Sequence, residues 1–172
     1  MVVTPLAERP TGSCSIVVGE MVDAVPPEAP SDERPRAAVL EKLREFLAGD
    51  LKDVGEKERI GITSMRAAKR NWPCEARLGS SDTLLAPGNI ALTGKVLAYR
   101  RGSRLARYFL GFGLGKSEVL VQLRLREPGR AQDLFVGHFR GEVGGGFAGG
   151  SEFGALRAVS VNFAEWLRDR WR

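Results

Sequence analysis

Residues 118–126, with the sequence E-V-L-V-Q-L-R-L-R, indicate which kind of fold this chain adopts. Every second residue of the segment is apolar: Val119, Val121, Leu123 and Leu125. This period of two is typical of a β-strand that buries one face, and the strand is predicted over residues 116–126. A Pro-Gly turn at residues 127–130 and a second strand at residues 133–143 follow it. Together with a strand at residues 90–99, these segments predict an antiparallel meander.

The strand at residues 90–99 is expected to place Ile90, Leu92, Val96 and Ala98 on one apolar face. Gly94 interrupts that face. A glycine inside a strand is typical of a β-bulge, so the sequence predicts a bulge at Gly94.

The first half of the chain alternates strand and helix signals. Residues 15–22 are a short apolar, β-branched run that is typical of a central strand buried on both faces. A helix is predicted over residues 35–48, where apolar residues repeat at helical spacing and Gly49 follows as a stop signal. Residues 59–63 are then predicted to form a short strand. A strand, a helix and a strand in this order favour a right-handed parallel crossover.

The remaining segments connect these elements or end the chain. Residues 65–71 are compatible with one or two helical turns that end at Trp72-Pro73, and residues 79–88 are loop-like. Residues 144–150 hold five glycines and predict a flexible linker. A final helix is predicted over residues 151–171. Its apolar stripe consists of Leu156, Val159, Phe163, Trp166 and Leu167.

The length of 172 residues and the hydrophobic content of 43% are sufficient for one sizeable core. Residues 1–13 are rich in turn formers and are expected to be an extended lead-in, while residues 14–172 form a single domain. Each predicted helix carries one apolar stripe and therefore needs one sheet face. The predicted fold is α/β (α+β), a mixed sheet of about five strands with two amphipathic helices packed on one face.

Residues 104–117, R-L-A-R-Y-F-L-G-F-G-L-G-K-S, resemble a phosphate-binding loop without meeting its requirements. That motif needs four residues between its first glycine and the Gly-Lys-Ser, whereas only three separate Gly111 from Gly115. A phosphate-binding loop also runs into a helix after the lysine, and here a strand follows. The spacing of Gly111, Gly113 and Gly115 fails the dinucleotide-binding pattern as well. The sequence therefore predicts no nucleotide and no other cofactor.

The same segment is the candidate contact surface of the chain. The predicted interaction residues are Arg104, Arg107, Tyr108, Phe109 and Phe112. Because strands flank the segment, it is expected to be a hairpin-like excursion in which Gly111, Gly113 and Gly115 allow the turn. Exposed aromatic side chains beside arginines suit a protein interface or an anionic membrane surface. The alternative is that the aromatic side chains fold back and cover one end of the sheet.

Basic residues are concentrated at Arg100, Arg101, Arg104 and Arg107, although the formal net charge is only +5. Such a patch is compatible with a solvated turn, with a protein or membrane contact, or with the phosphates of a nucleic acid. No recognised nucleic-acid-binding fold accompanies the patch. Nucleic acid is therefore the less favoured partner.

Residues 90–150 resemble a known family. The resemblance rests on the strand that begins Ile90-Ala91-Leu92-Thr93-Gly94, on the motif Arg107-x-x-x-Gly111-Phe112-Gly113-x-Gly115, and on the glycine-rich tail. These features resemble a bacterial domain family of unknown function that occurs in secreted and lipid-anchored envelope proteins. The element order is more distantly similar to the α/β domains of curli-secretion-type and penicillin-binding-protein-activator lipoproteins. The resemblance implies no catalytic residues, and the chain departs from lipid-anchored proteins because no apolar run precedes Cys14.

The residues that carry catalysis in other proteins form no recognisable pattern here. His138 is the only histidine and lies on a predicted strand, which favours a packed or edge histidine over a general base. No serine has the flanking glycines of a nucleophile elbow. One histidine and two cysteines cannot assemble a Cys/His zinc site. The sequence predicts a protein that is not an enzyme, with no catalytic residue, metal or small-molecule substrate.

The two cysteines, Cys14 and Cys74, are too few for a disulfide scaffold. A single bridge between them would fit an oxidising compartment, and two buried free thiols are the alternative. We predict that they lie close enough to bridge if the protein is exported. The sequence shows no signal pattern at its N-terminus, so a periplasmic or outer-membrane-associated location requires that a leader was removed.

These observations favour a non-enzymatic bacterial cell-envelope module that binds another protein or assembles with copies of itself, with possible contact to a membrane surface. A basic nucleic-acid-binding domain is the alternative. Affinity for an oligonucleotide that falls steeply with salt would distinguish the second function from the first, because counterion release drives phosphate binding.

Overall fold

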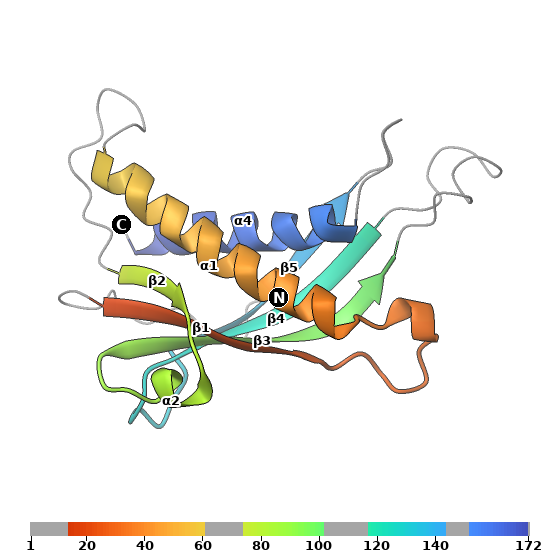
Figure 1. Cartoon of the computed structure of the whole chain (residues 1–172), viewed down its shortest axis with the longest axis horizontal. Coiled ribbons are helices and arrows are strands. Elements are labelled where there is room, and N and C mark those ends of the chain that lie inside the picture. The colour runs from red at the N-terminus through yellow and green to blue at the C-terminus, as the bar shows by residue number, and fades with distance from the viewer. Residues whose placement is uncertain (1–13, 61–73, 102–116, 144–151, 172) are drawn as a thin grey trace.

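The computed structural model describes residues 14–60, 74–101, 117–143 and 152–171 (Figure 1). Its elements, in chain order, are β1 (Cys14–Asp23), η1 (Ser31–Glu33), α1 (Ala37–Ile60), β2 (Cys74–Leu78), α2 (Ser81–Leu84), β3 (Asn89–Arg100), β4 (Ser117–Arg126), β5 (Phe135–Val143) and α4 (Glu152–Arg170). The predicted lead-in at residues 1–13, the helical turns at residues 65–71 and the linker at residues 144–150 lie outside the described residues.

The five strands form one mixed sheet in the order β2-β1-β3-β4-β5. β1 pairs in parallel with β2 and with β3, while β3, β4 and β5 form an antiparallel meander. α1 and α4 lie side by side on the same face of the sheet, and the short α2 lies on the opposite face beside β1 and β3 (Figure 1). The predicted α/β fold, with a mixed five-stranded sheet and two helices on one face, is confirmed.

The turn between β4 and β5 forms as its sequence predicts. Gly129 has a φ of 86°, a backbone conformation that favours glycine and that a type II turn requires at this position. The N–H of Arg130 donates to the carbonyl oxygen of Glu127 at 3.2 Å. The connection closes where the N–H of Leu134 donates to the carbonyl oxygen of Leu125 at 2.9 Å, and Leu125 then pairs with Phe135.

The first helix is longer than the sequence predicts. α1 continues through Gly49 to Ile60, so the predicted stop at Gly49 and the predicted strand at residues 59–63 are wrong for the residues that the structure describes. Leu47 and Leu51 are fully buried one turn apart, and burial of such a side chain contributes about 1.5–3 kcal/mol. A glycine inside a helix costs only about 1 kcal/mol, so the helix continues.

The parallel crossover that was predicted is formed by a later strand. β2 begins at Cys74 and pairs in parallel with β1, so the strand, helix and strand order is kept with a different second strand. The segment predicted as a loop at residues 79–88 also contains the short helix α2. Gly79 and Gly19 both lie against neighbouring side chains here: a Cβ on Gly19 would lie 2.6 Å from a methyl carbon of Leu84.

The bulge in β3 is displaced from its predicted position. Gly94 pairs regularly with Leu123, and the register between β3 and β4 shifts between Val96 and Ala98 instead. Because Leu97 is the extra residue, Tyr99 rather than Ala98 joins the buried face, and Ala98 is exposed. Gly94 is needed for space, since a Cβ there would lie 2.6 Å from the sulfur of Met21.

The hydrophobic core lies between the sheet and the two helices. Phe163 of α4 is fully buried and its ring centroid lies 5.1 Å from that of Phe139 and 6.5 Å from that of Phe135. The ring of Trp166 adds to this cluster at 4.4 Å from Phe135. The apolar stripe predicted for the last helix therefore does pack on the sheet.

Candidate functional site

The predicted interaction residues fall in a segment that the structure does not describe. Arg104, Arg107, Tyr108, Phe109 and Phe112, with the predicted turn glycines Gly111, Gly113 and Gly115, all lie within residues 102–116. The strands on either side of the segment pair with each other, up to Arg100 opposite Glu118. The segment thus joins two neighbouring antiparallel strands, which is the connection that a hairpin-like excursion requires.

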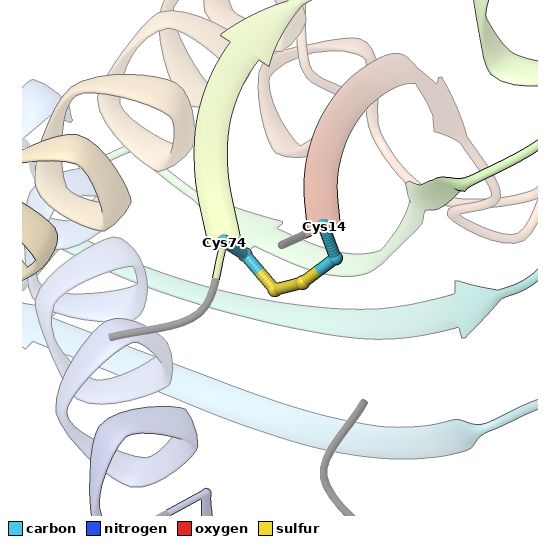
Figure 2. The surroundings of a disulfide bond; sticks show 2 residues. All are labelled: Cys14 and Cys74. Carbon is cyan, nitrogen blue, oxygen red and sulfur yellow. A yellow bond between two sulfur atoms is a disulfide. The ribbon is translucent and has the colours of Figure 1, made fainter. Parts of the chain in front are cut away.

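The two cysteines are joined in a disulfide (Figure 2). Cys14 opens β1 and Cys74 opens β2, and the two residues face each other directly in the parallel pair. Their Cα atoms are 4.3 Å apart, well inside the separation of about 7 Å beyond which a bridge needs backbone movement. The structure therefore holds the bridge rather than two free thiols. It links the first strand to the edge strand across 60 residues of sequence.

The face of β3, β4 and β5 that points away from α1 and α4 is rich in polar and charged residues, and we call it the open face. Alternation places it opposite the buried residues Leu92, Leu123 and Leu125. Its polar and charged residues are Thr93, Lys95, Arg100, Glu118, Gln122, Arg124, Arg126, His138, Arg140 and Glu142. The opposite face of the same strands is apolar, so every strand of the meander has one buried and one polar side.

Ion pairs cover one part of the open face. Arg140 of β5 contacts Glu118 at 2.9 Å and Glu142 at 2.7 Å. Arg124 of β4 contacts Asp133, in the loop before β5, at 3.2 Å. The Arg140–Glu118 pair links β4 to β5. Both arginines are about half exposed, so solvent screens each of these ion pairs.

Other cations on the open face have no acidic partner. Lys95, Arg100 and Arg126 are exposed and form no ion pair with any residue that the structure describes. Lys95 lies opposite Gln122 on β4, and Arg126 lies opposite Ala91 on β3. The open face therefore carries both a paired region, over β4 and β5, and an unpaired basic region, over β3 and β4.

The sequence contained a signal for this surface. In residues 118–126 the apolar residues mark the buried face, while Glu118, Gln122, Arg124 and Arg126 mark the other face at the same period. Only Arg100 of the open face lay in the predicted basic patch. The sequence pattern alone does not show which cations find partners, because Arg140 and Glu118 meet only when β4 and β5 align.

His138 lies on the open face of β5, which is an edge strand of the sheet. Its Nε2 lies 3.2 Å from the side-chain nitrogen of Gln122 on the neighbouring strand, and the imidazole is half-buried. This is the edge-strand histidine that the sequence favours. Within residues 14–60, 74–101, 117–143 and 152–171, no group of three histidine, cysteine or acidic residues is placed to hold a metal ion.

Three charged residues on the helix side, Asp50, Arg157 and Arg44, join neighbouring elements. Asp50 of α1 is buried and contacts Arg157 of α4 at 3.2 Å, which joins the two helices. Arg44 of α1 donates to the carbonyl oxygens of Val18 at 3.3 Å and Gly79 at 2.5 Å. Arg44 thus ties α1 to β1 and to the loop after β2. No helix among the described residues is long and apolar enough to cross a membrane.

Part of the chain is similar to an uncharacterised domain. Residues 74–156, from β2 to the first turns of α4, match the model of a domain of unknown function, DUF4410. No curated protein sequence matches the chain. The predicted resemblance to an uncharacterised bacterial domain family is supported at this level.

The fold is similar to that of solved bacterial structures. PelC from Paraburkholderia phytofirmans, a dodecamer, has a TM-score of 0.54 at 13% identity, over 92% of this chain and 91% of PelC. Protein XCC0632 from Xanthomonas campestris, of the DUF330 family, has a TM-score of 0.50 at 10% identity, over 95% and 89% of the two chains. Hypothetical protein CT253 from Chlamydia trachomatis has a TM-score of 0.50 at 6% identity, over 93% and 98%. At these identities the similarity concerns the fold alone.

Proposed function

We propose that this chain is a non-enzymatic module of the bacterial cell envelope that binds another protein or assembles with copies of itself. The observation that carries the proposal is the arrangement at the end of the meander. β3 and β4 stay paired up to Arg100 and Glu118, and between them the chain inserts the arginines and aromatic residues of residues 104–112. The sequence predicts that these aromatic side chains are exposed beside the arginines, and an exposed apolar surface rimmed by cations is suited to a protein contact.

The disulfide supports the envelope location. Bridges such as Cys14–Cys74 persist in oxidising compartments, including the bacterial periplasm, and are rare where thiols are kept reduced. A periplasmic or outer-membrane-associated protein would retain this bridge. The similarity to envelope lipoproteins that the sequence suggests points to the same compartment.

Self-assembly is supported by the similarity to PelC, which forms a dodecamer. A shared fold does not determine an oligomeric state, so the similarity motivates the test without replacing it. The nucleic-acid alternative gains no support from the similar proteins, and no feature of the described residues favours it over a protein contact.

The test compares the wild-type protein with the double variant Phe109→Ser/Phe112→Ser by light scattering and by binding to anionic vesicles. If residues 104–112 form an interface, the double variant stays folded and loses self-association or vesicle binding. A matched control is Leu85→Ser/Phe153→Ser, because Leu85 and Phe153 are large apolar residues that are 73% and 38% exposed. The control should retain both properties.

A different outcome would assign the aromatic residues to the core. Burial of each phenylalanine contributes about 1.5–3 kcal/mol, so the double variant would then show a large fall in melting temperature. The proposed interface would be contradicted if the double variant melts at a much lower temperature while its self-association and vesicle binding stay those of the wild-type protein.

A further inference from the structure

We infer that the open face of the sheet is a second contact surface, and that it binds an acidic surface of another protein. This inference rests on the proposed protein-binding function and names the chemistry of the partner. Its centre is a basic stripe of three residues, Lys95 on β3 and Arg124 and Arg126 on β4. All three side chains are exposed and lie on the same face of neighbouring strands.

Two of the three cations of the basic stripe, Lys95 and Arg126, have no carboxylate partner among the described residues. On the helix side, Lys42 contacts Glu45 at 2.7 Å, and Arg168 contacts Asp169 at 3.1 Å. In the stripe, only Arg124 has a carboxylate partner among the described residues, at Asp133. The stripe therefore presents an uncompensated positive charge to whatever lies against it.

The open face carries negative as well as positive side chains, so its charge is not uniform. Arg140 draws Glu118 and Glu142 together on the neighbouring part of the face. A surface that combines unpaired cations with fixed carboxylates is complementary to a patterned protein surface, because charge pattern sets orientation and rejects wrong partners. The geometry thus favours a partner whose carboxylates meet the stripe and avoid Glu118 and Glu142.

A membrane fits this face less well. The large apolar side chains that are exposed in the described residues are Leu78, Leu85 and Phe153, and none of them lies on the open face. Leu120 on that face is only half-buried between charged neighbours. A uniformly anionic lipid surface would gain no apolar insertion here and would be repelled by Glu118 and Glu142.

A second copy of the same face is also disfavoured. The open face carries five cations, Lys95, Arg100, Arg124, Arg126 and Arg140, and only two carboxylates, Glu118 and Glu142. Two copies of this face therefore repel each other through their net positive charge. The outer face of β1 is not available either, because the α2 segment covers it: a Cβ on Gly79 would overlap a methyl group of Val17. The accessible part of the sheet is therefore the meander.

The experiment measures binding of the full chain, with its disulfide intact, to poly-L-glutamate as the acidic probe. The test variant is Lys95→Glu/Arg126→Glu. The control variant is Arg36→Glu/Lys52→Glu, which changes the net charge equally at two exposed positions on the α1 side. Phosphatidylglycerol vesicles and a single-stranded oligonucleotide are measured in parallel. Circular dichroism and melting temperature establish that each variant is folded, since all four positions are exposed.

We expect the wild-type protein to bind poly-L-glutamate, with affinity that weakens as salt rises from about 0.05 M to about 0.5 M. The test variant should lose at least about tenfold in affinity, because two attractive contacts become repulsive, and the control should stay within about threefold. Equal losses in both variants would mean attraction by net charge alone and would overturn the inference. Vesicle or oligonucleotide binding that the test variant abolishes, without binding of poly-L-glutamate, would overturn it as well. The Phe109→Ser/Phe112→Ser test examines other residues. A negative result for the basic stripe therefore does not decide the proposed function, which that separate test decides.

Discussion

The two faces of the β3–β5 meander differ in the interactions that their side chains make: one face is buried and apolar, and the other is polar and partly exposed. On the helix side, Leu123 and Leu125 of β4 are fully buried beneath α4. On the open face, alternate residues of the same strand are only partly covered: Gln122 contacts His138, and the exposed Arg124 contacts Asp133. Burial of an apolar side chain contributes about 1.5–3 kcal/mol, whereas an exposed ion pair contributes about 0–1 kcal/mol.

This difference indicates that the helix side stabilises the fold, while the open face is available to contact a partner. Substitutions on the helix side change the packing that defines the fold, so they are costly. Substitutions on the open face change charge with little effect on folding, so that face is free to serve recognition. The predictions that follow challenge this division, beginning with the largest expected effect.

Phe163→Ala should lower the free energy of unfolding by about 3–5 kcal/mol, because it removes the fully buried ring at the centre of the aromatic cluster. Denaturant unfolding measures the loss. Phe153→Ala on the same helix is the control, and with a side chain already 38% exposed it should cost much less. Equal losses would mean that the helix side is not the dominant source of stability.

Cys14→Ser/Cys74→Ser should lower the free energy of unfolding by about 2–4 kcal/mol, since the bridge restrains a long loop in the unfolded chain. Melting temperature with and without a reductant measures the effect. Reductant should lower the melting temperature of the wild-type protein to that of the double variant. A wild-type protein that does not respond to an effective reductant would show that the bridge contributes nothing.

Gly141→Ala should lower the free energy of unfolding by about 1–3 kcal/mol. A Cβ on Gly141 would overlap the carbonyl oxygen of Ala155, so α4 would have to move away from β5. Gly49→Ala is the matched control, because a Cβ there meets no atom within 4 Å in the middle of α1. The control should raise stability by about 0.5–1 kcal/mol, as alanine favours helix. If Gly141→Ala raised the free energy of unfolding as Gly49→Ala is expected to do, the close approach of α4 to β5 would be contradicted.

Arg140→Ala should change the free energy of unfolding by less than about 1 kcal/mol, although it removes the contacts to both Glu118 and Glu142. Urea unfolding at low and high salt measures this change, and the small difference from wild type should shrink at high salt. A loss comparable to that of Phe163→Ala would show that the open face contributes to the fold, and the contrast between the faces would then fail.

The sequence predicted the parts of the fold that depend on short-range pattern. The alternation of Val119, Val121, Leu123 and Leu125 is visible without knowing what covers it, and so is the Pro-Gly turn at Gly129. The predicted stop at Gly49 was wrong because glycine is only a local stop signal. Burial of Leu51, which depends on the sheet beneath the helix, outweighs that signal. Likewise, the bulge after Val96 follows from how β3 aligns with β4.

The candidate site was predictable to a lesser degree. Cys14 and Cys74 were expected to approach each other, and both begin strands that pair in parallel. The partners of individual charges were not predictable, since Arg140 and Glu118 are distant in sequence and meet only through the register of β4 and β5. The residues 104–112 stay a prediction, because they lie outside the described residues.

Site-specific photo-cross-linking in bacterial cells tests the proposed protein contact most directly. A photoreactive phenylalanine analogue replaces Phe109 or Phe112, and Leu85, which is 73% exposed, serves as the control position. The account predicts that irradiation joins positions 109 and 112 to protein, either a second copy or another envelope protein, and that position 85 gives only background. If positions 109 and 112 give no more adduct than position 85 in folded, disulfide-bonded protein, the account is contradicted.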